Sequence, residues 1–341
     1  MEHVADASGT GRPPRVVELR ADAALVLGID AGGTRIRAVL ADLEGAVRAS
    51  VTGVVRSPED GEAVLAAIAG LVSEARAGQP RGRVLAAAAG ISGIVDQAEG
   101  TVLLSPDLPG LQGVAVADRL EESLRLPVGI DNDDVLAAVG EAAFGAARGC
   151  SDVVFLSLGF GLGAGLIVGG RPVRGARAAA GAIAYLTPGR LEDRASGRAI
   201  PERYIERVGR AGARSRGRID AREVFVRAAE GDRAAGAIVR EAVEALGQLV
   251  VNVAALLDPE VIVIGGGLAE NGPTLFEPLA ERLANAVPYP PRLVPSGLGE
   301  DAVARGAAAL ALTLAKQRLA NRSRTTSAHA EPARVGALEL V

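Results

Sequence analysis

The sequence is poor in the residues that build metal centres and histidine-dependent catalytic sites. It has one cysteine, Cys150, and two histidines, His3 and His329, which lie near the two ends of the chain. A single cysteine cannot form an internal disulfide and is typical of a protein from a reducing cytosol. Without a histidine in the central part, a zinc site and a histidine-based catalytic triad are not expected there. We therefore expect a cytoplasmic protein without zinc.

Long apolar runs and an excess of positive charge are also missing. No run reaches the roughly 20 apolar residues that a membrane-spanning helix needs, and the first residues do not resemble a signal peptide. The formal net charge is −4, so no overall positive field attracts nucleic acid or an anionic membrane. The 341 residues, 49% of them hydrophobic, instead fit a globular protein of one large or two medium-sized domains. Nucleic acid and a membrane surface are therefore not expected as partners.

Strand and helix patterns alternate between two polar ends. Residues 1–23 and 320–341 are rich in small, polar and charged residues and are expected to be disordered. Three β-type runs with very short links predict an antiparallel meander at Leu25–Ile29, Arg35–Ala41 and Ala46–Val55. Ser57 and Pro58 are then expected to start a helix. The next predicted elements are Val84–Ala89 (strand), Gly113–Leu124 (helix), Pro127–Asp131 (strand) and Asp134–Ala146 (helix).

The same order begins again in the second half. The predicted elements are the strands Asp152–Leu158, Ala164–Val168, Arg171–Arg174 and Val261–Ile264, and the helices Ala234–Leu257, Pro273–Ala286 and Asp301–Leu319. Two such halves predict a duplicated α/β fold with a cleft between two lobes. We expect a small lobe at 24–131, completed by a C-terminal helix at 300–319, and a large lobe at 132–299. One ordinary doubly wound sheet is the alternative.

Two glycine-rich turns each join the strands of a hairpin. The first contains Asp30, Gly32, Gly33 and Thr34, and the second contains Gly159, Gly161 and Gly163. Glycines let backbone N–H groups approach phosphate oxygens, although either turn alone is also what a tight hairpin needs. Walker A and dinucleotide-binding loops differ, because they join a strand to a helix.

A carboxylate beside a phosphate-binding turn requires a cation. Asp30 would repel a triphosphate unless a metal ion lies between them, and Mg²⁺ prefers hard oxygens and keeps several waters. We therefore predict that Asp30 holds Mg²⁺ through water. Thr34 and Arg35 are then predicted to donate to phosphate oxygens.

Two further stretches carry chemistry. In IDNDDVLAAVGE, Ile130–Glu141, an Asn and three acids stand between a strand and a helix. One such residue suffices to cap the helix, so a surplus acid is a candidate general base. In LDPEVIVIGGGLA, Leu257–Ala269, a strand runs into Gly265, Gly266 and Gly267. This turn is either a plain connection or a bare backbone surface for a flat ring or ribose.

Together these motifs resemble the ROK sugar kinases, the glucokinase-like branch of the actin/hexokinase/Hsp70 ATPase superfamily. The matching stretches follow the family's order over roughly Leu25–Leu319: GIDAGGTRIR, AAGISGIVD, LLSPDLPGLQG, DNDDVLAAVGE, LSLGFGLGAGLIVGG, ASGRAI, LDPEVIVIGGGLAE and DAVARGAAALAL. The resemblance implies a duplicated actin-like ATPase (ribonuclease H-like) fold, ATP and Mg²⁺ as cofactors, and an alcohol acceptor. It also makes a homodimer an expectation.

The resemblance implies a role for each matching residue. Asp133 matches the base that takes the proton from the CH₂OH of the sugar. Substrate contacts are implied for Gly93, Asp107, Asn132, Asp133 and Glu192. Phosphate contacts are implied for Asp30, Gly32, Gly33, Thr34, Gly159, Gly161 and Gly163, and adenosine contacts for Gly265, Gly266 and Gly267.

Most departures from the family lie on the side of the sugar opposite to the reacting hydroxyl, and one lies in the second phosphate turn. The family's glucokinases carry AGEIGH, whose Glu and His touch the sugar, whereas this chain reads AGAIAY with Ala182 and Tyr185. The zinc-binding cysteines that should follow are replaced by LTPGRLEDRASG, and Phe160 replaces a phosphate-binding Thr. The loss favours an acceptor with fewer hydroxyls there, such as a C7-cyclitol of the valiolone type phosphorylated on its C7 hydroxyl in aminocyclitol natural-product biosynthesis. Phosphorylation of glucose on its 6-hydroxyl is the equal alternative.

Two other classes of protein are alternatives to a kinase. Phe160 and the lost sugar contacts favour a non-catalytic pseudokinase or sugar-binding regulator, whereas intact Asp30 and Asp133 argue against it. The family's repressors carry an N-terminal helix-turn-helix. The two dozen or so residues before Leu25 are too few for that module, so we do not expect a DNA-binding repressor.

Overall fold

Two five-stranded sheets with the same strand order form the framework of the protein. The computed structural model describes residues 20–80, 83–186, 190–214 and 219–327. The first sheet has the order β3-β2-β1-β4-β7, and the second has the order β10-β9-β8-β11-β12. In each sheet the first three strands along the chain are antiparallel to one another, and the last two are parallel to the central strand. The repeated order confirms the predicted duplicated α/β fold.

The strands are short, and the central ones are apolar on both faces. The first sheet consists of β1 (Leu25–Ala31), β2 (Arg35–Asp42), β3 (Val47–Val54), β4 (Val84–Ile91) and β7 (Val128–Asn132). The second consists of β8 (Val153–Leu158), β9 (Leu162–Val168), β10 (Arg171–Pro172), β11 (Val261–Gly265) and β12 (Arg292–Pro295), and a separate hairpin is formed by β5 (Ile94–Asp96) and β6 (Thr101–Leu104). Along β1, Leu27 and Ile29 enter one core cluster and Val26 another. Such continuous apolar runs suit a sheet covered on both sides.

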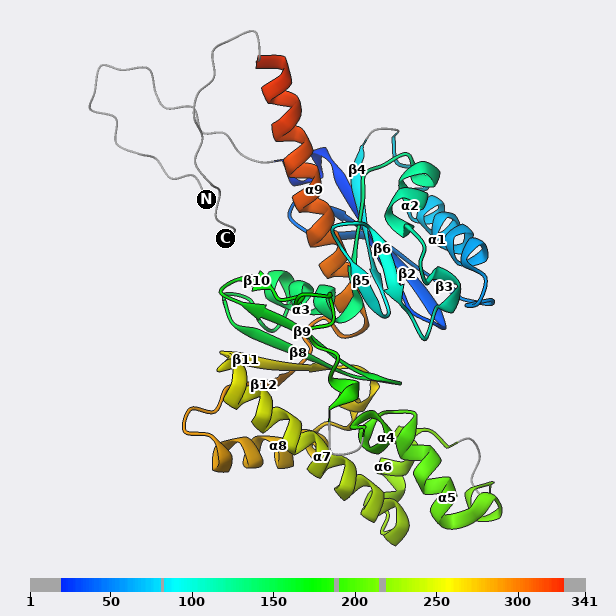
Figure 1. Ribbon diagram of the computed structural model, residues 1–341, viewed down its shortest axis with the longest axis vertical. Coiled ribbons are helices and arrows are strands. Elements are labelled where there is room, and N and C mark those ends of the chain that lie inside the picture. Colours follow the sequence, from blue (N-terminus) through cyan, green and yellow to red (C-terminus); the bar gives the residue numbers. More distant parts are fainter. Residues whose placement is uncertain (1–19, 81–82, 187–189, 215–218, 328–341) are drawn as a thin grey trace, which may run out of the picture.

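Helices from both ends of the chain cover the first sheet. α1 (Gly61–Ala75) and α2 (Val116–Leu124) pack on one face. The alanine-rich α9 (Ala302–Ser327) lies against β1 and β4 on the other face (Figure 1). A Cβ atom at Gly28 would overlap the backbone of Ala304. Glycine in the strand and alanine in the helix therefore allow this close approach.

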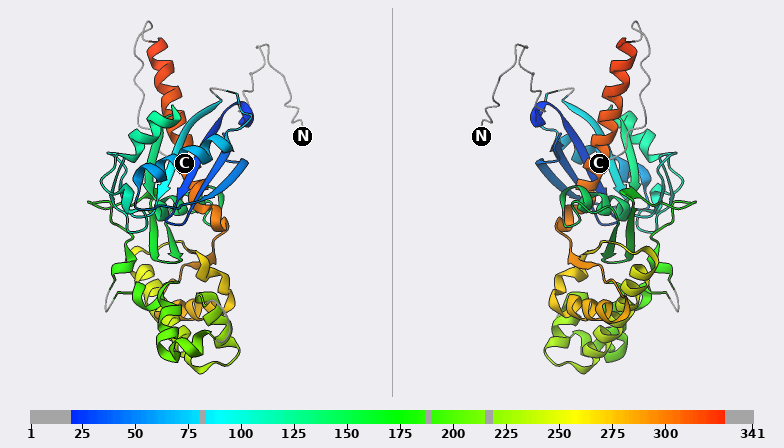
Figure 2. Two further views of the ribbon diagram at one scale, coloured as in Figure 1. Left: turned by 90° about the vertical axis from the view of Figure 1, so that its right-hand side faces the viewer. Right: turned by 90° about the vertical axis from the view of Figure 1, so that its left-hand side faces the viewer.

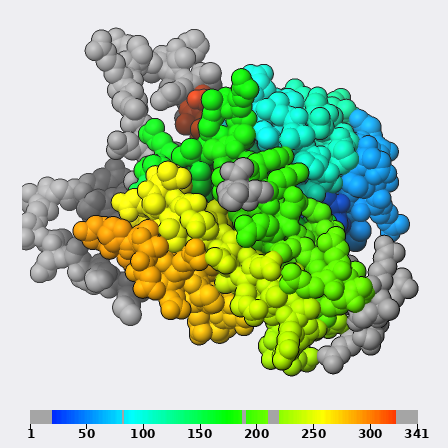
Figure 3. Space-filling view, turned by 60° about the horizontal axis from the view of Figure 1, so that its bottom comes forward, coloured from blue at the N-terminus to red at the C-terminus, as the bar shows by residue number. Residues whose placement is uncertain are grey.

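The second sheet carries a larger helical layer. α3 (Asp133–Phe144) packs on one face. The other face is covered by α7 (Arg233–Leu257) and α8 (Pro273–Ala286), with α4 (Glu192–Ala195), α5 (Ala199–Arg214) and α6 (Ala221–Ala229) beside them. Figure 2 shows the helices from α4 to α8, in green to orange, at one end of the elongated molecule, and Figure 3 shows the surface of the molecule with that end turned forward.

Two helices join the halves. α3 and α9 cross where a Cβ at Gly140 would overlap the Ala302 carbonyl and one at Gly306 would overlap the Leu136 carbonyl. The backbones are thus in direct contact, which requires glycine at both positions. Because α3 begins at Asp133, this contact also fixes the helix that carries the predicted base.

Several predicted boundaries are wrong. α1 begins at Gly61 because the Asp60 side chain accepts the Ala63 N–H (3.1 Å), whereas Ser57 belongs to a turn closed by its carbonyl and the Asp60 N–H. α2 begins at Val116, since Gly113 has a φ of +77° and donates to the Val102 carbonyl.

The end of the chain also differs from the expectation. α9 continues to Ser327, so the prediction of disorder is wrong for residues 320–327. Residues 1–19 and 328–341 lie outside the described residues. Within the described parts of the chain, every helix is too short or too polar to pass through a bilayer.

Candidate active site

The two predicted glycine turns and the acid cluster meet at one cavity of about 490 Å³. Gly32 and Gly33 reach it from the β1–β2 turn, Gly159, Gly161 and Gly163 from the β8–β9 hairpin, and Asp133 from the start of α3. Gly93, Asp107, Asn132 and Glu192 line it as well. Of the predicted site residues, Asp30, Thr34, Arg35 and Gly265–Gly267 are not among the described residues that line this cavity.

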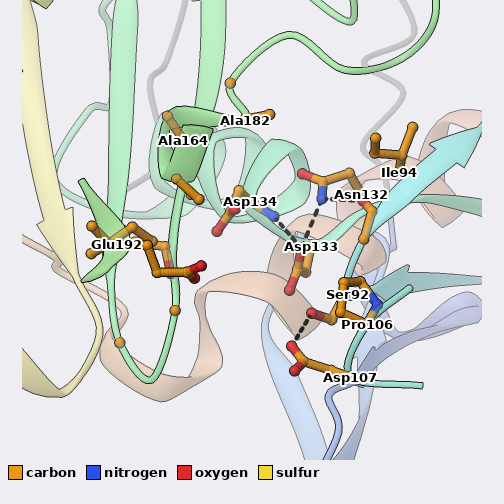
Figure 4. A pocket seen from close by; sticks show the side chains of 18 of the residues that line it. Ser92, Ile94, Pro106, Asp107, Asn132, Asp133, Asp134, Ala164, Ala182 and Glu192 are labelled. Atoms are coloured by element: carbon orange, nitrogen blue, oxygen red, sulfur yellow. Dashed lines mark hydrogen bonds between the residues drawn. The ribbon is translucent and has the colours of Figure 1, made fainter. Parts of the chain in front are cut away.

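Asp133 is held by its two neighbours. Its Oδ1 accepts the Asp134 N–H at 3.0 Å and the Asn132 side-chain amide at 2.9 Å (Figure 4). Asn132 is the N-cap of α3, because its Oδ1 accepts the Val135 N–H, and its Nδ2 also donates to the Gly93 carbonyl at 2.7 Å. The amide thus positions both the carboxylate and the Gly93 loop.

The other two acids of the cluster face different partners. Asp131 is 1% exposed, and its Oδ2 accepts from Arg174 Nη2 at 2.6 Å and Nε at 3.0 Å. Asp134 lines the cavity and forms a side-chain hydrogen bond with Ser157. A Cβ at Gly163 would overlap the Asp134 carboxylate. Position 163 therefore needs glycine for two reasons: the tight turn, and the Asp134 carboxylate, which leaves no room for a Cβ atom.

Burial raises the pKa values of two acids in this cluster, and for Asp133 the neighbouring acids add to the effect. Burial raises the pKa of the Asp133 carboxyl well above its usual range, and the negative charges of Asp134 and Asp30 raise it further. Burial likewise raises the pKa of Asp134 to about 6. Such shifts are typical of carboxylates that take part in proton transfer.

Asp30 lies inside β1, behind the first glycine turn. Burial raises its pKa to about 6, against the opposing effect of Arg37 and Arg35. Both arginines are engaged by the turn before α9: Arg35 pairs with Glu300 at 3.0 Å, and Arg37 pairs with Glu300 at 2.6 Å and with Asp301. A phosphate contact by Arg35 would compete with Glu300.

The other predicted substrate residues also lie against the glycine turns. A Cβ at Gly33 would come within 2.8 Å of the Asp107 carbonyl, and one at Gly161 within 2.9 Å of Glu192 Oε1. Asp107 accepts from the Ser92 hydroxyl at 2.9 Å (Figure 4). Sequence reasoning missed Ser92, which directly precedes Gly93 and lines the cavity.

The third glycine motif touches the second. Gly266 has a φ of +83°, and a Cβ there would meet the Leu158 carbonyl at 2.6 Å and the Gly159 nitrogen at 2.8 Å. Gly265 faces the Phe155 ring, whereas a Cβ at Gly267 would meet no heavy atom within 4 Å. The fold therefore explains the first two glycines of the motif and leaves Gly267 to be explained.

One wall of the cavity is almost entirely alanine. It is formed by residues 178–184, of which five alanines and Gly181 line the cavity. Ala182 stands on this wall (Figure 4). At its edge Tyr185 is half-exposed, with the Arg190 guanidinium 5.2 Å from its ring centre. This alanine wall offers a ligand no hydrogen-bonding side chain.

Comparison with known proteins identifies the relationship. The model of the ROK family matches residues 26–314. This chain belongs to the ROK family. Among solved structures, a ROK glucokinase from Streptomyces griseus in complex with glucose and AMPPNP is similar with a TM-score of 0.73 and 29% identity, covering 84% of this chain and 99% of that one. The ROK chain accordingly has the actin-like ATPase fold that the resemblance implied.

Relatives of the ROK chain include proteins of two kinds. A glucokinase from Streptomyces coelicolor is 30% identical over 277 residues, which are 75% of this chain and 86% of the relative. A xylose repressor from Caldicellulosiruptor bescii is also 30% identical, over 292 residues that are 80% of this chain and 73% of the relative. The equal identity to these two relatives therefore does not distinguish a kinase from a regulator, so the distinction rests on the residues of the candidate site.

Proposed function

We propose that this ROK protein is an ATP-dependent sugar kinase that phosphorylates the primary hydroxyl of a hexose-like polyol. The observation that carries the proposal is the carboxylate of Asp133, which lies in the same cavity as both glycine turns. The similar glucokinases, one of them in complex with glucose and AMPPNP, support the same reaction.

In this reaction Asp133 accepts the proton of the acceptor hydroxyl while the oxygen of that hydroxyl attacks the γ-phosphorus of ATP. A P–O bond forms to the acceptor, and the bond to ADP breaks. Asn132 and the Asp134 N–H orient the carboxylate through its Oδ1. Backbone N–H groups of the glycine turns neutralise charge on the phosphoryl oxygens. Positioning supplies most of the catalysis in such a transfer.

The residues present fit a Mg²⁺ ion shared with the nucleotide. The described residues contain no group of three His, Cys, Asp or Glu side chains that could hold a metal ion by themselves. Mg²⁺ commonly takes one or two carboxylates, several waters and substrate phosphates. Asp30, whose pKa burial raises to about 6, would hold the ion through water, and the bound ion would offset negative charge on the phosphates.

The alanine wall supports an acceptor with few hydroxyls on the side away from Asp133. A C7-cyclitol of the valiolone type meets this description. Glucose would leave its hydroxyls on that side without a side-chain partner from the wall, at a cost of about 1–3 kcal/mol for each one that cannot reach water. The specific proposal is therefore phosphorylation of the C7 hydroxyl of such a cyclitol, with 6-phosphorylation of glucose as the competing outcome.

The test combines turnover with nucleotide binding. ADP release with Mg-ATP is measured for glucose and for a valiolone-type cyclitol, and the phosphorylated product is identified by mass spectrometry. Asp133→Asn is expected to lower turnover at least about 100-fold, the usual contribution of a general base, with ATP affinity nearly unchanged. Asp118→Asn is the matched control, since Asp118 also lies in the first turn of a helix but is exposed.

A sugar-binding regulator without catalysis is the second candidate, favoured by the similarity to a xylose repressor. It would bind a sugar or cyclitol, shown by calorimetry, without releasing ADP in the presence of any polyol. Near-normal turnover of Asp133→Asn would remove Asp133 as the base.

A further inference from the structure

Only one residue of the alanine wall, Ile183, buries its side chain in the core, so the alanines of the wall are not held through their side chains. The position of the wall depends on backbone contacts: the Ala180 N–H donates to the Arg174 carbonyl at 3.0 Å, and the Ala164 N–H donates to the Gly181 carbonyl at 2.9 Å. The wall also contains Ala178 in a left-handed conformation, with a φ of +54°, which is strained for an alanine. Arg174 and Ala164 are therefore two points that hold the wall by backbone contacts, and the position of Arg174 affects that of Ala180.

Arg174 is fixed by the strand that carries the catalytic pair. Its guanidinium bonds to Asp131 in β7 through Nη2 at 2.6 Å and Nε at 3.0 Å. Asp131 is buried, and its Oδ1 accepts the Asn132 N–H at 2.9 Å. Asn132 in turn bonds to Asp133. One short path therefore leads from the wall, through Arg174 and Asp131, to the proposed base.

We propose that the Asp131–Arg174 ion pair sets the distance between the alanine wall and Asp133, and thereby determines which acceptor the cavity takes. Both are positioning residues. The proposal rests on the proposed kinase function, in which the acceptor occupies the space between Asp133 and the wall. The geometry suits this role: Arg174 Nη2 and Nε both donate to Asp131 Oδ2, and Nε also reaches Oδ1 at 3.3 Å. Several N–H···O bonds from one planar guanidinium restrict orientation as well as distance.

A second ion pair in the same chain provides the matched control. Asp42 is as buried as Asp131, and its Oδ2 accepts from Arg48 Nη2 at 2.6 Å and Nε at 2.9 Å. Its Oδ1 accepts backbone N–H groups of Glu44 and Ala46. The chemistry is nearly the same, but this pair lies in the β2–β3 hairpin, whose residues do not line the described cavity.

The experiment compares Arg174→Met with Arg48→Met in two measurements. Hydrogen exchange of the segment 174–186 is followed in the ligand-free protein, and KM values for the acceptor and for ATP are determined with kcat. Arg174→Met is expected to speed exchange at Ala180 and to raise the acceptor KM about tenfold or more, a loss of uniform binding. The ATP KM should stay within about twofold. Arg48→Met is expected to lower the melting temperature comparably and change neither readout.

Two further variants keep the test decisive where Arg174→Met leaves too little folded protein. Arg174→Lys retains the charge but not the planar guanidinium with its two N–H donors, and is expected to raise the acceptor KM less than Arg174→Met does. The double variant Asp131→Asn/Arg174→Gln removes both charges while keeping a hydrogen-bonding pair. Its acceptor KM is expected to lie closer to the wild-type value than to that of Arg174→Met.

The outcomes separate this inference from the kinase proposal. Unchanged exchange in Arg174→Met and in Arg174→Lys, or faster exchange with an unchanged acceptor KM, would overturn the positioning role. An equal rise in acceptor KM for Arg48→Met would reduce the effect to general loss of stability and overturn it as well. If the wild-type protein phosphorylates no polyol, the kinase proposal fails, whereas the exchange measurement still reports whether the ion pair orders the wall.

Discussion

The four consecutive polar residues from Asp131 to Asp134 have four different surroundings. One binds an arginine, one caps α3, one lies in the cavity beside the glycine turns, and one bonds to Ser157. Helix capping explains only Asn132. The remaining three carboxylates are crowded together in a partly buried place. Such crowding destabilises the fold, and proteins tolerate this cost mainly at functional sites.

The pKa shift of Asp134 gives a prediction about pH. Its folded-state pKa of about 6 lies above the ordinary value of 3.8, so the folded protein binds more protons and its stability falls as pH rises from about 4 to about 6. Asp134→Asn is therefore expected to raise the free energy of unfolding at pH 8 by on the order of 2 kcal/mol and to flatten this pH dependence, measured by urea denaturation without ligands.

The same variant tests the coupling to Asp133. Because the Asp134 charge raises the pKa of Asp133, its removal should move the acid limb of the kcat–pH profile to lower pH. Asp118→Asn is the control for both measurements. A fall in stability at pH 8, or an acid limb that moves to higher pH, would contradict this account of the cluster.

The sequence predicted single residues of the site better than their partners. The acid cluster and the glycines of both turns could be found because their chemistry is local: acids where a strand meets a helix, and turns without Cβ atoms. The choice of Asp133 among these acids came from the family resemblance. The Asp131–Arg174 pair joins residues 43 positions apart, and Arg35 is held by Glu300 from the far end of the chain. No local pattern in one sequence reveals such contacts.

At the scale of elements, the strands that were predicted lie within a few residues of their observed bounds, and the helix starts were predicted less well. The short strands β5, β6 and β12 and the helices α4, α5 and α6 were not predicted. Strand periodicity is set by burial on the two faces of the sheets, which the apolar runs record directly. The start of α1 depends on which of Ser57 and Asp60 caps the helix, and both are suitable residue types. The tertiary contact of Pro58 with Gly110 selects the turn at Ser57, and this contact is not visible in the sequence.

The glycine motif after β11 gives a prediction at this scale, because its glycines differ in what the fold demands. Gly266→Ala is expected to cost at least about 2 kcal/mol of stability, since it combines a positive φ with a clash against Leu158. Gly267→Ala should leave stability within about 0.5 kcal/mol. If adenosine packs against this backbone, Gly267→Ala should still weaken ATP binding several-fold, measured by calorimetry.

Either of two results would contradict this division of roles. Equal destabilisation by the two substitutions would mean that Gly267 is also needed for folding. Unchanged ATP affinity in Gly267→Ala would remove the motif from the nucleotide site, although it would leave the kinase proposal intact.

At the scale of the whole molecule, the chain passes between the two sheets at two places, and both are in contact with α3. The first passage leads from β7 into α3 at Asn132–Asp133, and the second leads from β12 through Ser296–Leu298 towards α9. Glu141 of α3 is fully buried and accepts hydrogen bonds from Ser296 Oγ, the Gly297 and Leu298 N–H groups, and the Ala146 N–H. The Glu141 carboxylate therefore holds the segment Ser296–Leu298 against α3.

This arrangement predicts that Glu141 links the folding of the two halves. Glu141→Ala would leave several buried donors without an acceptor, at about 1–3 kcal/mol each, so we expect a loss of at least about 3 kcal/mol in urea denaturation. A smaller m-value or two separate transitions should accompany it, because halves that no longer unfold together expose less surface in one step. Glu260→Ala is the control: Glu260 also accepts two backbone N–H groups, of Ser151 and Asp152, but it is exposed, so water replaces it at a cost of about 1 kcal/mol or less. A Glu141→Ala protein that unfolds in one transition with the stability of Glu260→Ala would show that contacts between α3 and α9 alone join the halves.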